Sequence, residues 1–186
     1  MAYKKTYLII ISLFFIIFCT IHFSKENSIS NHEWKKYSSE YIKKHLNTLI
    51  VYPDSVKSKR DEMITSQNVK ILFSVDIDCS ACRIKFTFWN EFCNNIYSKY
   101  KIRVPIVAYI SGVDRNIDKI VEEEWDKSWV YDKNEEFIIK NDLFDDRFQA
   151  VLVDQNNIIK LIGNPMHNPD LANLYEKVLL RYFKEK

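Results

Sequence analysis

Two cysteines with the spacing C-x-x-C, Cys79 and Cys82, stand between an apolar run and a long helical pattern. The run, residues 69–75, is Val-Lys-Ile-Leu-Phe-Ser-Val, which is typical of a buried strand. The helical pattern covers residues 80–100, so the pair falls on its first turn. A helix N-terminus places partial positive charge beside the first sulfur and stabilises the attacking thiolate. The second sulfur, one turn away, can resolve a mixed disulfide, so this arrangement predicts a redox-active dithiol.

Strand and helix patterns alternate along the rest of the chain. We expect strands at 69–75, 104–110, 129–131, 148–154 and 158–162, and helices at 80–100, 114–126, 134–140 and 169–183. Residues 155–157, Gln-Asn-Asn, indicate a hairpin between the last two strands. This order predicts an α/β fold with a central mixed sheet, a C-terminal antiparallel hairpin at one edge, and helices on both faces.

At this point the chain resembles the thioredoxin fold, and in particular the membrane-tethered thioredoxin-like proteins of the TlpA type. The resemblance covers residues 69–183 and rests on the strand before Cys79-Ser80-Ala81-Cys82, on Trp129-Val130-Tyr131-Asp132 before a short helix, and on Ala150–Asp154 followed by Ile158–Gly163. It implies a thiol–disulfide oxidoreductase that acts on protein disulfides or dithiols and needs no organic cofactor. Cys79, nearer the helix N-terminus and solvent, is the expected nucleophile, and Cys82 the resolving thiol.

Two positions depart from the family pattern. Such proteins usually carry an aromatic residue before the first cysteine, where this chain has Asp78. They also carry a cis-proline that helps to dock the substrate peptide, and the corresponding position here is Phe148 or Gln149. The resemblance therefore implies a substrate-docking loop at Phe148 and Gln149. The missing proline favours a narrow partner, or a redox-inactive binding module of a cell-envelope complex.

Three charged residues near the cysteines are candidate modulators of the thiol. Asp76 and Asp78, if close to Cys79 in space, raise its pKa, which favours a reductant over a strong oxidant. Arg83 would partly oppose them. The alternative is that both carboxylates only cap a solvated loop. For the cysteine pair itself, the alternatives are a structural disulfide without turnover, or a thiol peroxidase in which Cys79 is oxidised to sulfenic acid.

The first 24 residues form a unit of their own. Lys4 and Lys5 precede residues 7–23, which are mostly apolar and near the lower length limit for crossing a bilayer. We expect an uncleaved signal anchor; a cleaved signal peptide and a lipid-modified Cys19 are the alternatives. Each of these places the rest of the chain across the membrane, as the periplasmic domain of a single-pass bacterial inner-membrane protein or as a secreted or lipid-anchored periplasmic protein.

Between this segment and the predicted domain, residues 25–68 are expected to form a linker and an N-terminal helical extension. A helix is expected from about Glu33 to Leu49, with Pro53 ending it. The thioredoxin-like domain is then expected at residues 69–186. Cys93 lies about 16 Å along the helix axis from Cys82, too far for a disulfide, and is expected to be a buried core thiol.

Composition excludes several other functions. The formal net charge is only +2 with both signs interspersed, which argues against a nucleic-acid partner. The chain has only 2 glycines, so it has no Gly-rich cradle for a nucleotide. A zinc site needs four N or S ligands, but there is one C-x-x-C and no H-x₃₋₅-H spacing among the 4 histidines. We therefore expect no metal.

Overall fold

The computed structural model describes residues 36–54, 68–80, 83–113 and 117–184. The expected signal segment, residues 1–24, and Cys82 lie outside these ranges. None of the helices in the described ranges is both long and apolar enough to cross a bilayer. The chain divides into two units, residues 1–44 and 45–186. The sheet belongs entirely to the second unit, which is the part described below.

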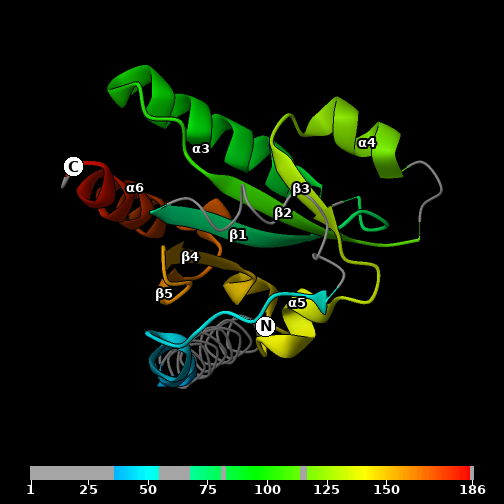
Figure 1. Cartoon of the computed structure of the whole chain (residues 1–186), viewed down its shortest axis with the longest axis horizontal. Helices are drawn as coiled ribbons and strands as arrows, with labels where there is room; N and C mark the ends of the chain where they lie inside the picture. Colours follow the sequence, from blue (N-terminus) through cyan, green and yellow to red (C-terminus); the bar gives the residue numbers. More distant parts are fainter. Residues whose placement is uncertain (1–35, 55–67, 81–82, 114–116, 185–186) are drawn as a thin grey trace, which may run out of the picture. The chain divides into compact units, whose positions relative to one another are not determined.

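A five-stranded sheet with the order β3-β2-β1-β4-β5 forms the centre of this unit (Figure 1). Its strands are β1 (Val69–Asp76), β2 (Ile106–Ser111), β3 (Ser128–Tyr131), β4 (Ala150–Asp154) and β5 (Ile159–Ile162). β1 pairs with β2, and β2 with β3, in parallel, whereas the pairs β1–β4 and β4–β5 are antiparallel. The predicted fold class, a mixed sheet of thioredoxin-like order with a C-terminal hairpin, is confirmed.

Helices cover both faces of the sheet, as expected. They are α3 (Ile84–Tyr100), α4 (Ile117–Glu124), α5 (Glu136–Lys140) and α6 (Pro169–Lys184). Ala108 and Ile110 of β2 join the core cluster that contains buried residues of α3, α4 and α6. Tyr109, between them, points to the opposite face because side chains alternate along a strand. There it stacks on Phe137 of α5, with ring centroids 4.1 Å apart.

The expected helix at 33–49 ends earlier than the sequence indicated. Helical structure runs over residues 36–45, and Asn47 then adopts a positive φ of 63°. Beyond this turn the chain runs along β5: the N–H of Asn47 donates to the carbonyl of Ile159, and the N–H of Ile159 donates to the carbonyl of Thr48, both at 2.9 Å. The edge strand needs partners for its free backbone groups, and this extended segment supplies them.

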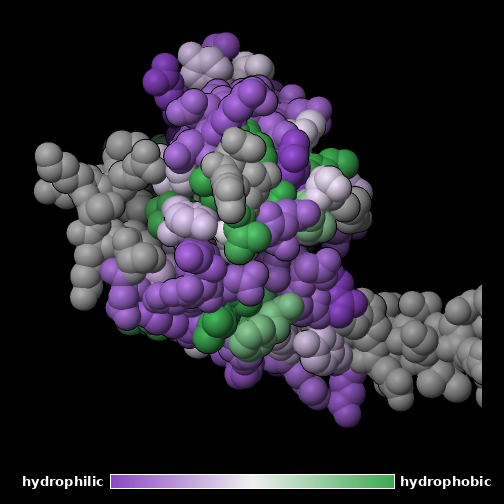
Figure 2. Space-filling model, turned by 90° about the vertical axis from the view of Figure 1, so that its right-hand side faces the viewer, coloured by the Kyte–Doolittle hydropathy of each residue, from purple (hydrophilic) through white to green (hydrophobic). Residues whose placement is uncertain are grey.

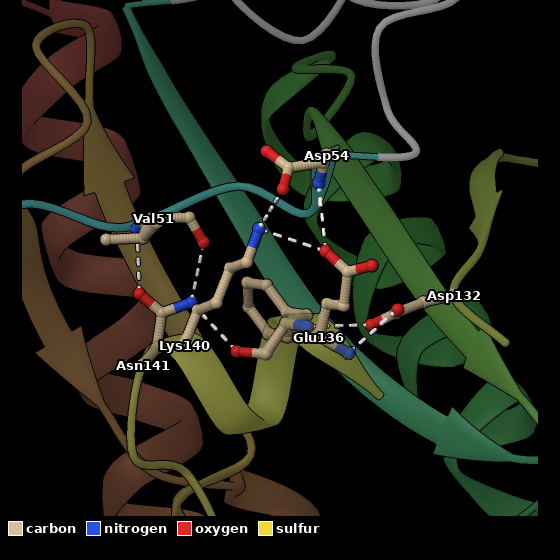
Figure 3. A network of polar contacts seen from close by, with 7 residues as sticks. Val51, Asp54, Asp132, Glu136, Lys140 and Asn141 are labelled. Atoms are coloured by element: carbon tan, nitrogen blue, oxygen red, sulfur yellow. Dashed lines mark hydrogen bonds and ion pairs between the residues drawn. The ribbon is translucent and has the colours of Figure 1, made fainter. Parts of the chain in front are cut away.

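A network of polar contacts joins α5 to the extended segment that follows residue 47 (Figure 3). The carboxylate of Asp132 accepts the N–H groups of Glu136 and Phe137 at 2.9 and 2.8 Å, which satisfies donors of the first turn of α5. The side chain of Asn141 accepts the N–H of Val51 and donates to its carbonyl, both at 2.7 Å. These contacts attach the segment before the sheet to the face that α5 covers.

Replacing Asn141 by alanine is expected to lower the free energy of unfolding by about 1–3 kcal/mol, because the side chain is buried and its backbone partners lose their hydrogen bonds. Urea unfolding followed by circular dichroism measures this change. The matched control is Lys140→Ala, which removes the ion pairs to Asp54 and Glu136 on the surface. Surface ion pairs contribute little, so a loss in the control as large as in Asn141→Ala would contradict the assignment.

Candidate active site

Cys79 lies three residues after the end of β1, the central strand of the sheet, and is half-buried. Ile77 prolongs the pairing of β1 with β2, since its N–H donates to the carbonyl of Ser111 at 3.1 Å. Cys79 is disulfide-bonded. Its position at the carboxyl ends of two parallel strands is where open α/β sheets place their ligand sites.

The helix after the cysteines begins later than the sequence indicated. We expected it to start at residue 80, but α3 starts at Ile84, with Arg83 in the N-cap position. Isolated turn bonds lead into it: the N–H of Arg83 donates to the carbonyl of Cys79 at 3.3 Å, and the N–H of Phe86 donates to the carbonyl of Arg83 at 3.0 Å. Cys79 therefore precedes the regular helix and is tied to its start by one backbone hydrogen bond.

The two aspartates near Cys79 hold the loop in shape. One carboxylate oxygen of Asp76 accepts the N–H of Asp78 at 2.9 Å, and Asp78 in turn accepts the N–H of Val113 at 2.8 Å. Gly112 permits this close approach: its φ is +122°, and a Cβ there would lie 2.8 Å from Cγ1 of Ile77. Loop capping is therefore the structural role of both carboxylates, and their effect on the Cys79 thiol stays a prediction.

Arg83 pairs with a residue that the sequence did not connect to it. Its Nε donates to Oε2 of Glu124 at 3.1 Å, and its Nη2 contacts the other carboxylate oxygen, so the pair is bidentate. This contact joins the start of α3 to the last residue of α4. The positive charge of Arg83 is thus paired with a carboxylate, and its effect on the Cys79 thiol stays a prediction.

The face of the molecule at which β2 ends is mostly hydrophilic with small apolar patches (Figure 2). The right-hand side of Figure 1, where β2 ends, faces the viewer in Figure 2. Ile84, the first residue of α3, is 54% exposed, and Val113, which follows β2, is 77% exposed. Both belong to segments that contact the Cys79 loop, because Arg83 and Asp78 make the hydrogen bonds described above. The site therefore offers apolar contacts beside the cysteine.

Lys85 is a buried cation that sequence reasoning missed. Its side chain lies on the first turn of α3 and is 8% exposed. Nζ donates to the carbonyl of Ser74 on β1 and to Oε1 of Gln149, each at 3.1 Å. Burial lowers its pKa, while the carboxylates of Asp146 and Asp76 raise it. The sequence around Lys85 does not indicate burial, because the groups that bury it come from distant parts of the chain.

The predicted docking loop lies just before β4. Phe148 ends the 3₁₀ helix η2 (Asp146–Phe148) and is buried, so its side chain contributes to the core. Gln149 is half-buried, and its carbonyl accepts the N–H of Ser74 at 3.0 Å. Because Ala150 pairs with Phe73 of β1, Gln149 lies toward the carboxyl end of β1, as Cys79 does. The docking role itself stays a prediction.

A groove of about 1050 Å³ lies at the other end of the sheet, where β1, β2 and β3 begin. Its lining includes Lys70, Tyr97, Arg103, Trp129 and Cys93, which is a free thiol. Cys93 is 6% exposed, and burial raises its pKa to about 12. The expectation of a buried core thiol is confirmed.

Cys93 is expected to resist alkylation in the folded protein. With a pKa of about 12, only on the order of one thiol in ten thousand is a thiolate at pH 8. Iodoacetamide treatment at pH 8, with peptide mapping by mass spectrometry, should modify Cys93 only after unfolding in guanidinium. Rapid labelling of native Cys93 at the rate of a free small-molecule thiol would contradict its burial.

Comparison with known proteins gives similarity in fold only. No family profile matches the chain, and no curated protein matches it. Among solved structures, a candidate thiol:disulfide interchange protein DsbE from Chlorobium tepidum is 17% identical, covering 64% of this chain and 83% of its own, with a TM-score of 0.46. A thiol:disulfide interchange protein from a Bacteroides species is 19% identical, covering 72% and 90%, with a TM-score of 0.45.

A further match is the thioredoxin domain of a thiol-disulfide oxidoreductase from Bacteroides vulgatus, 18% identical, covering 63% of this chain and 82% of its own, with a TM-score of 0.42. The fold is thioredoxin-like. The strand order and the strand directions described above define this fold. The chemistry of the site rests on this chain's own residues.

Proposed function

We propose that this protein is a thiol–disulfide oxidoreductase whose redox pair is Cys79 and Cys82. The observation that carries the proposal is the position of Cys79: it is disulfide-bonded, half-buried, and placed at the carboxyl end of the central strand of a thioredoxin-like sheet. The proposed disulfide partner is Cys82, three residues further along the chain. Apolar contacts beside the site, from Ile84 and Val113, suit a protein substrate.

In the proposed reaction, the reduced pair transfers two electrons to a disulfide of a partner protein. The Cys79 thiolate attacks one sulfur of that disulfide, forming a mixed disulfide, and the other partner sulfur leaves as a thiol after taking up a proton. The Cys82 thiolate then attacks the Cys79 sulfur and releases the second partner thiol. The partner gains two electrons and two protons, and Cys79 and Cys82 become a disulfide. A dithiol donor must reduce this disulfide for the next turnover.

The proposed location is the extracytoplasmic side of a bacterial inner membrane. The support is the apolar stretch at residues 7–23, which follows Lys4 and Lys5. In this proposal residues 1–24 are the anchor, residues 25–68 the linker and helical extension, and residues 69–186 the redox domain. Extraction of membranes with alkaline carbonate tests the anchor, since an anchored protein stays in the membrane pellet and a secreted one does not.

The test of the activity is reduction of insulin by the full-length protein with dithiothreitol as electron source, followed as turbidity. Faster reduction than with dithiothreitol alone is expected. Consumption of hydrogen peroxide under the same conditions distinguishes the peroxidase alternative. If insulin is not reduced, the oxidoreductase proposal fails; inactivity in both assays would favour the binding module.

A further inference from the structure

The carboxamide of Gln149 has a defined orientation, and Lys85 sets it. A lysine ammonium has three donors and no acceptor, so the atom of Gln149 that faces Nζ of Lys85 must be the oxygen, Oε1. The amide nitrogen, Nε2, is therefore directed away from the lysine. Within the described ranges, Nε2 makes no hydrogen bond, although it can donate two. Gln149 is only half-buried, so this donor is within reach of a ligand.

Lys85 itself is held firmly enough to act as an orienting group. It has two acceptors at 3.1 Å, the Ser74 carbonyl of β1 and Oε1 of Gln149, and is 8% exposed. The Gln149 main-chain carbonyl also accepts the N–H of Ser74. Lys85 therefore links α3 to β1 and to the segment before β4. Burial lowers the pKa of Lys85, and the negative charges of Asp146 and Asp76 act in the opposite direction. The charged form donates only, which keeps the carboxamide in one orientation.

This contact lies at the same end of the sheet as Cys79. Gln149 neighbours Ser74 near the carboxyl end of β1, and Cys79 lies three residues after the end of that strand. Lys85 lies on the first turn of α3, whose start is bonded to the Cys79 carbonyl through Arg83. In the proposed reaction, the partner peptide meets Cys79 at this end of the sheet. Main-chain carbonyls are acceptors that every peptide presents, whatever its side chains.

We propose that Lys85 is a positioning residue that aims the carboxamide of Gln149, so that Nε2 donates a hydrogen bond to a main-chain carbonyl of the peptide docked at Cys79. This inference rests on the proposed function, because it names the group that holds the substrate of that same site. Phe148, being buried, contributes no side chain to this contact.

Two variants test separately the hydrogen-bond donor of Gln149 and the positioning role of Lys85. Gln149→Glu keeps the shape and gives Lys85 a carboxylate to bind, but removes the N–H donor. Lys85→Met keeps much of the volume and apolar stem but leaves the carboxamide free to rotate. The matched control is Gln155→Glu, the same chemical change at an exposed position of the β4–β5 turn. Thermal unfolding of each variant shows whether the fold is retained.

The experiment is an NMR titration of the full-length, ¹⁵N-labelled protein in detergent with a synthetic ten-residue peptide that carries serine in place of the reactive cysteine. We expect the side-chain amide signals of Gln149 to shift on saturation. Gln149→Glu and Lys85→Met should each weaken binding about 2–10-fold, the effect of one hydrogen bond, and Gln155→Glu should leave it unchanged. Absence of peptide binding, peptide binding with unmoved Gln149 signals, or wild-type affinity in Gln149→Glu would overturn the proposal.

Because the titration needs no turnover, it is independent of the redox reaction. A protein that binds the peptide through Gln149 but does not reduce insulin would contradict the proposed reaction and support the docking role. A protein that reduces insulin while its Gln149 signals stay unmoved would contradict the docking role alone.

Discussion

Cys79→Ser is expected to abolish insulin reduction, whereas Cys82→Ser is expected to stop the reaction one step later. Without the Cys79 thiolate no mixed disulfide forms, because only a thiolate attacks a disulfide sulfur at a useful rate. Loss of a nucleophile commonly costs on the order of 100-fold or more in turnover. In Cys82→Ser the first attack still occurs, but no thiol resolves the mixed disulfide. That variant should therefore accumulate a covalent complex with the substrate.

Two measurements distinguish Cys79→Ser from Cys82→Ser. Turnover by insulin turbidity should be lost in both, and non-reducing electrophoresis with mass spectrometry should find the trapped complex only in Cys82→Ser. Cys93→Ser is the matched control, because that thiol is buried and remote from the site, and it should keep wild-type turnover. A trapped complex in Cys79→Ser with Cys82 intact would reverse the assigned roles of the two cysteines.

Trp89→Ala is expected to be the most destabilising single substitution among the core residues of α3. Trp89 is fully buried and packs against rings from three elements, with centroids 5.6 Å from Phe73, 5.4 Å from Phe92 and 5.6 Å from Tyr175. Truncating a buried tryptophan leaves a large cavity and costs about 3–5 kcal/mol. For a domain of this size the melting temperature should fall by roughly 10–20 °C.

Trp129→Ala provides the comparison for that substitution. Trp129 lies on β3, the edge strand opposite β5, and is half-buried. Its truncation removes the same side chain from a position that solvent already reaches, so less than half of the Trp89 effect is expected. Thermal unfolding by circular dichroism measures both. An equal loss at the two positions would mean that the core is not centred on the contact between α3 and β1.

The fold could be predicted from the sequence because its signals are local. Val69–Asp76 is mostly apolar, as is typical of a central strand covered on both faces, and the Gln-Asn-Asn turn after Asp154 defines the hairpin. The early end of the first helix was not predictable in this way. Residues 47–50 leave the helix to pair with residues 157–159, more than a hundred positions away, and apolar periodicity carries no information about such partners.

The position of Cys79 after a strand could be predicted from the sequence, whereas the contacts of the residues around it could not. A C-x-x-C after a strand is visible in the sequence, but the contacts of its neighbours are tertiary. Arg83 meets Glu124 across 41 positions, and Lys85 meets Gln149 across 64. Neither pair follows a helical or strand spacing, so only the packing of α3 against α4 and β4 brings them together. The contact of Asp76 is local by contrast. Its carboxylate accepts the N–H of Asp78, two residues later, which is a spacing that the sequence itself indicates.

The reduction potential of the proposed Cys79–Cys82 pair tests the central claim most directly. Equilibration of the full-length protein with glutathione and with dithiothreitol buffers, read by mass spectrometry of the cysteine peptides, gives this value. A working exchanger should titrate reversibly between about −120 and −270 mV. A potential below about −300 mV, or no reduction while the protein remains folded, would mark a structural disulfide and contradict the oxidoreductase proposal.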